Sequence, residues 1–320
     1  QTNITHSPTD FFYAKKKTII QLTKNFDFII GTGAVPAYLN LINIKIDIFI
    51  PSGSDLYFLP FYKTKQLSKV SFKKFIKICY LTYHQRKGIK KSKNILFSYT
   101  NKEIEKCLKE LRYNGPRIKL ASPHIYIKEY EDKKIESFYN KNPTKISREF
   151  EKIRSESDFM IFHHCRHSWK NTRNTMDYKG NEKLIEGYSK FIKEKIALSP
   201  KLILFNYGHD VDQSKKIIRE LKIEKHISWF PVLERREIMY GISLSDVGVA
   251  EIGLSWITYS VILEFLCMSK PIITFRDDNL YKNDYDKLYD INNVKEIVDI
   301  HKKLKNIFRN KNKHIKIARK

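Results

Sequence analysis

Residues 245–275 read SDVGVAEIGLSWITYSVILEFLCMSKPIITF, and the fold can be worked out from this stretch. A short apolar run, Val247 to Ile252, meets a polar turn, and a helical segment with one carboxylate, Glu264, follows. Lys270-Pro271 ends that helix, and a second apolar run begins at Ile272. The pattern predicts a strand, a helix and a strand, which is the setting where open α/β sheets hold ligands. A carboxylate among apolar neighbours needs a partner, either a ligand or an internal Arg or Lys.

The same alternation of strand, turn and helix extends back from this stretch to residue 159. Apolar runs that end in Gly, Pro or polar turns predict strands at 159–163, 202–207 and 227–230. Helical spacing of apolar residues predicts helices at 181–198, 212–222 and 234–243. Strands that alternate with crossover helices make a parallel sheet, so we predict a complete Rossmann-like domain here.

The first part of the chain shows a similar but looser alternation. Strands are predicted at 27–30, 46–50, 94–99 and 118–121, with helices at 11–25, after Gly31-Thr32-Gly33, and from Asn101 to Gly115. The polar stretch 126–155 is predicted to be a linker. We therefore predict an α/β fold of two Rossmann-like domains that face a cleft: 1–150 with the linker, 151–300, and a basic tail at 301–320.

Composition indicates a folded protein of two domains. The chain has 320 residues, of which 42% are hydrophobic and 13% aromatic. No apolar run approaches the length of a membrane-spanning helix, and no signal segment precedes the first domain. The chain begins at Gln1, so we expect a trimmed N-terminus. The four cysteines have no C-x-x-C spacing, which favours reduced thiols in a cytoplasmic protein without structural zinc.

The formal net charge of +25 has two interpretations. One is a basic surface for nucleic-acid phosphates or an anionic membrane. The other is a lysine-rich composition that follows from biased coding, because Asn and Ile are abundant too. The charge is uneven, since residues 63–93 and 302–320 contain no Asp or Glu. Leu67, Val70, Ile78 and Leu81, with lysines beside them, indicate either an amphipathic helix on anionic lipid or a core-facing helix with a basic outer side.

Two cations lie where a phosphate could bind. Arg166 follows the predicted strand 159–163, and Lys179 precedes the predicted helix at Asn181. A strand end and a helix N-terminus with two fixed cations suit a phosphate, although a solvated basic loop is the alternative. The neighbouring His163, His164 and Cys165 do not predict a metal site, because adjacent strand residues point to opposite faces.

Two further turns are candidates for the same edge. Gly208 follows the strand 202–207, and the alternative to a binding role is a plain turn between a strand and a helix. Val232 follows Trp229-Phe230-Pro231, where its backbone N–H and C=O could read the edge of a flat base. The alternative for this segment is a core strand.

Taken in order, these segments resemble the donor-binding domain of family-4-type glycosyltransferases (glycosyl transferases group 1), which have the GT-B fold. The resemblance covers roughly residues 158–275 and rests on the following run: Arg166-His-Ser-Trp, Lys179-Gly-Asn-x-Lys-Leu-Ile, a strand before Gly208, Trp-x-Pro-x-Leu, Ser-Asp, and Leu-Glu264-x-Leu-x-x-x-Lys-Pro-Ile-Ile. The first domain matches more loosely, and the resemblance implies that the chain begins after the usual first strand and glycine loop.

The resemblance implies roles for the donor-side residues. Arg166 and Lys179 would hold the donor diphosphate, Gly208 and Val232 would line the nucleotide, and Glu264 would hold the ribose. The earlier Glu of the family's E-x7-E motif is Trp256 here, so the motif departs from the family and Glu251 is the acid that could replace it.

A second departure concerns the acceptor-side domain. Many members carry His-Gly-Ser/Thr-Asp in their first domain, and here the His position is Ser52. A serine cannot replace an imidazole electrostatically. Ser52 and Asp55 are therefore the predicted catalytic-side residues of the first domain, together with Glu251 of the second.

The resemblance implies a retaining, metal-independent glycosyltransferase (EC 2.4). It would move a sugar from a nucleotide-diphosphate donor to a hydroxyl of a glycan or lipid-linked acceptor in cell-surface glycan, lipopolysaccharide or capsule synthesis. No cofactor beyond the donor is expected, and Asp284-Tyr-Asp286 is interpreted as a chance D-x-D. The predicted location is cytoplasmic, including the inner face of the plasma membrane. Alternatives are a GT-B nucleotide-sugar epimerase, an inactive relative, or a nucleic-acid-binding protein, although RNP, KH and zinc-finger patterns are absent from the sequence.

Overall fold

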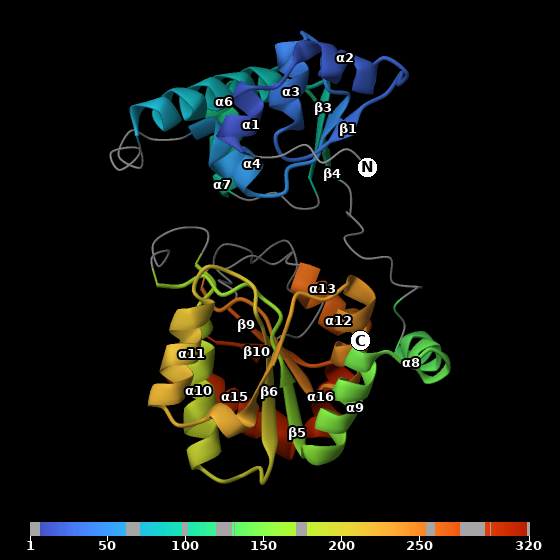
Figure 1. The fold of residues 1–320 in the computed structure, drawn as a ribbon, viewed down its shortest axis with the longest axis vertical. Coiled ribbons are helices and arrows are strands. Elements are labelled where there is room, and N and C mark those ends of the chain that lie inside the picture. The colour runs from blue at the N-terminus through green and yellow to red at the C-terminus, as the bar shows by residue number, and fades with distance from the viewer. Residues whose placement is uncertain are drawn as a thin grey trace. The chain divides into compact units, whose positions relative to one another are not determined.

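The computed structural model divides the chain into two compact units, Gln1–Ser122 and Pro123–Lys320. It describes residues 7–61, 71–97, 102–119, 130, 132–170, 178–253, 260–275, 292–294 and 296–318. Both units are α/β and each has its own parallel sheet (Figure 1). The predicted fold class, two α/β domains with parallel sheets, is confirmed.

The first unit is built on a sheet with strand order β1-β2-β3-β4, all parallel. Its elements are α1 (Pro8–Phe12), α2 (Lys16–Thr23), β1 (Ile30–Gly31), α3 (Val35–Leu41), β2 (Ile48–Phe49), α4 (Ser54–Tyr57), η1 (Leu59–Phe61), α6 (Phe72–Lys90), β3 (Asn94–Phe97), α7 (Lys102–Leu111) and β4 (Arg117–Lys119). The described strands follow chain order in one direction, so this part of the sheet has no reversal of strand order.

The second unit is built on a parallel sheet with strand order β10-β9-β8-β5-β6-β7. Its elements are α8 (Asp132–Lys141), α9 (Lys145–Glu156), β5 (Phe159–Phe162), α10 (Asn181–Lys193), β6 (Pro200–Phe205), α11 (Val211–Glu220), η3 (Glu224–His226), β7 (Ile227–Phe230), α12 (Arg235–Leu244), β8 (Val247–Val249), α13 (Ser260–Cys267), β9 (Ile272–Thr274), β10 (Asn292–Asn293), α15 (Ile297–Arg309) and α16 (Lys311–Ala318).

This second sheet has the doubly wound topology that the sequence predicts. The chain runs from β5 outward through β6 to β7, and then crosses to β8 on the other side of β5 and continues to β10. The order reverses between β5 and β8, and ligands of open α/β sheets bind beyond the strand ends at such a point. The candidate site is therefore expected at the carboxyl ends of β5 and β8.

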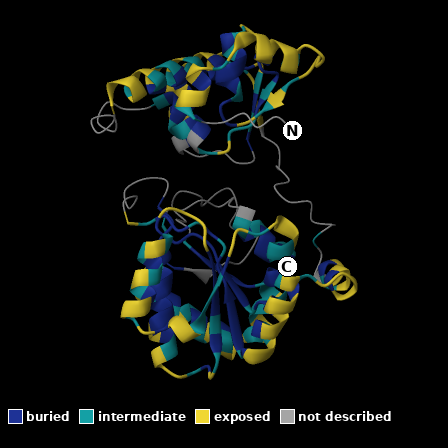
Figure 2. Ribbon diagram, in the orientation of Figure 1, coloured by how far each residue is buried: buried dark blue, intermediate teal, exposed yellow. Residues whose placement is uncertain are grey.

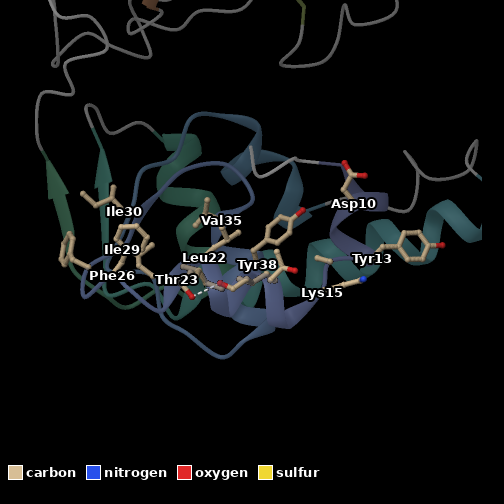
Figure 3. A pocket seen from close by; sticks show the side chains of 15 residues that line it. Asp10, Tyr13, Lys15, Leu22, Thr23, Phe26, Ile29, Ile30, Val35 and Tyr38 are labelled. Carbon is tan, nitrogen blue, oxygen red and sulfur yellow. Dashed lines mark hydrogen bonds between the residues drawn. The ribbon is translucent and has the colours of Figure 1, made fainter. Parts of the chain in front are cut away.

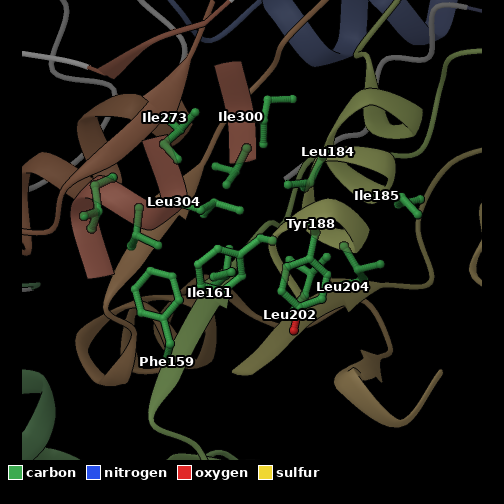
Figure 4. Packing of buried hydrophobic residues seen from close by; sticks show 14 of the residues in the cluster. Phe159, Ile161, Leu184, Ile185, Tyr188, Leu202, Leu204, Ile273, Ile300 and Leu304 are labelled. Carbon is green, nitrogen blue, oxygen red and sulfur yellow. The ribbon is translucent and has the colours of Figure 1, made fainter. Parts of the chain in front are cut away.

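Both faces of this sheet are covered, which explains the near-continuous apolar strands. All four residues of β5 are buried. Phe159 and Ile161 pack with Tyr188 of α10 and Leu304 of α15 on one face (Figure 4). Met160 and Phe162 pack on the other face with residues of α9, α12 and α13. Burial is concentrated along the strands, and the outer sides of the helices are exposed (Figure 2).

The stretch 126–155, predicted to be a linker, contains two helices of the second unit. Thr144 caps α9 through a reciprocal pair of hydrogen bonds with Ser147, and Phe150 and Ile153 are buried beneath α12. The predicted boundary at residue 150 therefore falls inside α9. The high content of charged residues hid an amphipathic helix of twelve residues, which buries only Ser147, Phe150 and Ile153 on one side.

The basic segment 301–320 is likewise continuous with the second unit. Its first residues belong to α15, which begins before residue 300 and packs on α10. Leu304 and Ile307 are buried in the core, whereas Lys302 is exposed. The described part of this segment therefore forms the end of the second unit's helical layer.

We expect Asp246→Asn to lower the free energy of unfolding of the second unit by about 2 kcal/mol. The carboxylate accepts from the Met160 N–H at 2.7 Å and pairs with Arg154 at 2.6 Å and Lys311 at 3.2 Å, which joins β5, α9 and α16. Chemical denaturation followed by tryptophan fluorescence measures this loss. Glu156→Gln, which removes only a surface pair with Lys152, is the control and should stay within about 0.5 kcal/mol. Equal effects of the two variants would contradict the assignment.

Candidate functional site

A buried ion pair lies at the predicted point of strand reversal. Lys179 precedes α10, and its Nζ is 2.6 Å from Oε1 of Glu251, which follows β8. Both side chains are about nine-tenths buried. The Ile252 N–H donates to the Lys179 carbonyl at 3.0 Å, and the Phe275 N–H donates to the Glu251 carbonyl at 3.1 Å. The backbone thus fixes both members of the pair where the strands end.

The N-terminus of α10 lies beside this pair. Gly180 has a left-handed φ of 70°, and a Cβ there would come within 3.0 Å of the Ile252 and Gly253 backbone. A glycine is therefore needed for α10 to begin so close to the end of β8. Asn181 accepts from the Ser168 N–H at 3.0 Å and donates to the Arg166 carbonyl at 3.3 Å. Arg166 and the first turn of α10 are held together in this way.

The carboxylate of Glu264, on α13, contacts two side chains, His164 and Arg235. Its Oε2 lies 2.5 Å from Nε2 of His164, and its Oε1 pairs with the Arg235 guanidinium. Burial raises the pKa of Glu264, but hydrogen bonds and charge from His164 and Arg235 outweigh this, so the pKa lies below its ordinary value of 4.5. Because the folded pKa is lowered, this carboxylate stabilises the fold above about pH 4.5, and the contribution is lost as pH falls through the folded pKa.

Four of the predicted residues act on one buried thiol. Burial raises the pKa of Cys165 well above its usual range, and the charges of Glu251 and Glu264 raise it further. Lys179 and Arg166 act in the opposite direction. These four residues therefore lie within electrostatic range of Cys165. Their roles in binding a donor stay a prediction.

Two buried histidines, His163 and His167, lie on either side of Arg166 in the sequence and make side-chain hydrogen bonds. Nδ1 of His163 donates to the Val249 carbonyl at 2.7 Å, so Nε2 accepts from the Asn181 amide at 2.9 Å. Burial lowers the pKa of His163 to about 4. The His167 ring is tilted against that of Trp229, with centroids 5.1 Å apart, and burial lowers the pKa of His167 to about 3. Both rings are neutral at neutral pH, and they hold the loops that carry Arg166 and Lys179.

The other two donor-side candidates lie in loops after β6 and β7. Gly208 has φ 109°, and a Cβ there would lie 2.3 Å from the His167 carbonyl oxygen, so only glycine fits this close approach. Val232 is 67% exposed in the loop between β7 and α12. Gly208 is thus tied to the His167 segment, whereas the Val232 side chain has a solvent-facing position and its proposed backbone contact stays a prediction.

In the first unit, Ser52 and Asp55 contact each other. Asp55 is fully buried and accepts from the Gly33 N–H at 2.8 Å, the Ser52 N–H at 2.9 Å and the Ser52 hydroxyl at 3.1 Å. Gln85 donates to the Gly33 and Asp55 carbonyls. Asp55 therefore fixes the loops after β1 and β2 to each other. This geometry gives Asp55 a positioning role, and a direct catalytic role for it or for Ser52 stays a prediction.

Sequence reasoning missed three contributors to the second unit's cluster: His164, Arg235 and Asn181. A signal for Arg235 exists, because α12 begins with two arginines at a helix end that normally favours acids. Such an unfavourable placement indicates a nearby anion, here Glu264. His164 could be read only as the neighbour of His163, since its partner lies 100 positions away.

Several predicted features lie outside the described residues. Trp256, at the departed E-x7-E position, and Asp284-Tyr-Asp286 are among them. Within the described ranges, no group of three or more His, Cys, Asp or Glu side chains is arranged to hold a metal ion. None of the four cysteines, all of which lie in the described ranges, forms a disulfide. In the same ranges, no helix combines the length and the apolar character needed to cross a membrane.

A separate pocket of about 770 Å³ lies in the first unit (Figure 3). Its lining is mainly apolar and comes from α1, α2, the segment before β1, and α3. Tyr13 and Lys15 lie toward one end, and Phe26 and Ile30 toward the other. None of the eight predicted site residues lines it. This pocket is therefore distinct from the charged cluster of the second unit.

The chain resembles several solved structures in fold. One is the structure of Anabaena HepE in complex with UDP-glucose. The match includes 99% of this chain and 78% of the HepE chain, with 12% sequence identity and a TM-score of 0.60. A second is WaaG, a glycosyltransferase involved in lipopolysaccharide biosynthesis. That match includes 100% of this chain and 79% of the WaaG chain, with 13% sequence identity and a TM-score of 0.63. A third is the S. aureus MnaA–UDP structure, for which the match includes 99% of this chain and 76% of the MnaA chain, with 10% sequence identity and a TM-score of 0.56.

No family model matches the chain, and no curated protein matches it in sequence. At 10–13% identity, the likeness to solved structures establishes the fold alone. The chain therefore has the two-unit α/β fold of these proteins, the GT-B class.

Proposed function

We propose that the chain is a nucleotide-sugar-dependent glycosyltransferase whose second unit binds the donor. The observation that carries the proposal is the buried Lys179–Glu251 pair at the N-terminus of α10, where the strand order reverses between β5 and β8. Asn181 of α10 donates to the Arg166 carbonyl and so holds the Arg166 loop beside this pair. Cations beside the N-terminus of α10 suit a diphosphate, and the ionised Glu264 suits ribose hydroxyls. Structures of similar fold contain UDP or UDP-glucose, which supports this ligand class.

The proposed chemistry is stabilisation of the departing diphosphate while the sugar passes to an acceptor hydroxyl. Lys179 and Arg166 neutralise charge that develops on the leaving group, which is the main route to rate enhancement in such a site. Glu251 holds Lys179 in place, and we propose that it takes the contact to the donor sugar. The retaining outcome, independence of metal, and a glycan or lipid-linked acceptor in cell-surface synthesis at the inner membrane face are parts of this proposal.

The test is whether the full chain binds UDP and UDP-sugars. Binding is measured as a change in melting temperature and by calorimetric titration. We expect UDP to raise the melting temperature, and Glu264→Gln to weaken UDP affinity by about tenfold or more because it removes a charged hydrogen-bond acceptor. Glu220→Gln, which removes a surface pair with Lys216, is the control and should bind UDP as the wild type does.

Two results would decide against the proposal. One is a panel of nucleoside diphosphates and their sugars in which no member stabilises the chain. The other is DNA-dependent stabilisation that falls steeply with salt, which would favour a nucleic-acid-binding protein. If UDP binds, release of UDP from UDP-sugars with and without EDTA tests whether the transfer needs a metal ion.

A further inference from the structure

The outward side of α6 is apolar, which is unusual for a helix on the surface of a unit. Phe72, Ile76, Cys79 and Tyr83 recur at intervals of four, three and four residues, so they lie on one side of the helix. Phe72 is 76% exposed, Tyr83 50% and Ile76 43%, and Cys79 is exposed as well. Figure 2 shows exposed residues recurring along α6.

Helix α1 extends this apolar surface. The Phe12 ring lies edge-on to Tyr80 of α6, with ring centroids 5.5 Å apart. Tyr13 is 66% exposed, and Nζ of Lys77 lies 4.6 Å from its ring centroid. Lys77 therefore links α6 to the exposed aromatic rings of α1. We call Phe12, Tyr13, Phe72, Ile76, Cys79 and Tyr83 the α6 face.

Cations surround this surface without any acid on the same helix. The sequence of α6, residues 72–90, has no Asp or Glu. Exposed lysines of this helix are Lys73, Lys74, Lys87 and Lys90. Nζ of Lys87 lies 4.5 Å from the Tyr83 ring centroid. Protein–protein interfaces are depleted in lysine, whereas helices that lie on anionic bilayers combine lysines with aromatic and aliphatic side chains.

We propose that the α6 face docks on an anionic membrane surface. Phe72, Ile76 and Tyr83 enter the headgroup region, and the lysines pair with lipid phosphates. The residues differ from those suggested by the sequence alone, because Ile78 and Leu81 are buried in the first unit. This docking surface rests on the proposed function for its location at the inner membrane face, whereas its test does not require nucleotide-sugar binding.

The test is cosedimentation of the full chain with phosphatidylcholine vesicles, with and without phosphatidylglycerol. We expect binding only to the anionic vesicles. Phe72→Ser with Ile76→Ser should lower the partition coefficient by about tenfold or more, because two apolar side chains no longer leave water. Leu198→Ser is the matched control, since Leu198 is 92% exposed in the second unit.

The lysines are tested separately. Lys73→Gln with Lys90→Gln should weaken binding by about tenfold, since each lysine near an anionic surface adds attraction. Lys190→Gln with Lys302→Gln, in the second unit, is the control of equal charge change and should bind normally. Unchanged melting temperature shows that a variant is folded.

Three outcomes overturn the docking proposal: wild-type protein that stays in the supernatant, equal binding to neutral vesicles, or α6-face variants that bind as well as the controls. The first outcome would leave a soluble partner as the occupant of this surface. UDP titration of the same preparations keeps the two proposals distinguishable, because a chain that fails to bind UDP can still sediment with vesicles.

Discussion

Lys179→Met should destabilise the second unit by about 3–5 kcal/mol and abolish measurable UDP binding. The substitution leaves the Glu251 carboxylate buried with its cation gone, since the two side chains are 2.6 Å apart and each about nine-tenths buried. Loss of one partner of such a pair costs far more than the pair itself contributes. Chemical denaturation followed by tryptophan fluorescence measures the effect, because all three tryptophans belong to the second unit.

A second variant separates the structural role from the proposed role in binding. Lys179→Met combined with Glu251→Gln removes both charges, so most of the lost free energy of unfolding should return. UDP affinity should nevertheless stay at least about tenfold below that of the wild type, because a charge-assisted contact to phosphate is missing. A double variant that is stable and binds UDP normally would show that Lys179 only supports the fold.

The sequence predicts the second unit more closely than the first for a physical reason. Its central strands are buried on both faces, so each appears as an apolar run with a turn after it, as at 159–162. The first unit's strands are as short as Ile30–Gly31, and they leave little pattern to recognise. Charge misled the interpretation of 126–155, because α9 is mostly charged and buries only one side.

The candidate site shows the same division between local and distant information. That Glu264 needs a partner follows from its apolar neighbours alone, and an internal Arg was one of the two alternatives. Which Arg supplies it depends on the sheet bringing α12 and α13 together, and no local pattern contains that. Asp55 shows the same limit, because its donor Gly33 is 22 residues away and becomes a neighbour only in the folded sheet.

Acid should unfold the second unit through His163 and His167, with a loss on the order of 3 kcal/mol for each between pH 6.5 and pH 4. Both folded pKa values lie below the ordinary 6.5. Below pH 6.5 the unfolded chain therefore binds protons on these two histidines while the folded chain does not. Stability is therefore full above pH 6.5 and falls as pH drops toward the folded values, near 4 and 3. Chemical denaturation at stepwise pH measures this slope.

Burial is the main reason why protonation is unfavourable at His163, and the contact with Asn181 adds to it. Its Nδ1 already donates to the Val249 carbonyl, and Nε2 accepts from Asn181, so a second proton would oppose a donor to a donor. His163→Gln and His167→Gln remove the titrating rings and should each flatten the slope across this pH range, although both lower stability at neutral pH. His301→Gln, in an exposed hydrogen bond to Glu194, is the control. A slope that persists in both buried variants would place the acid sensitivity elsewhere, among carboxylates such as Glu264, whose lowered pKa acts only below about pH 4.5.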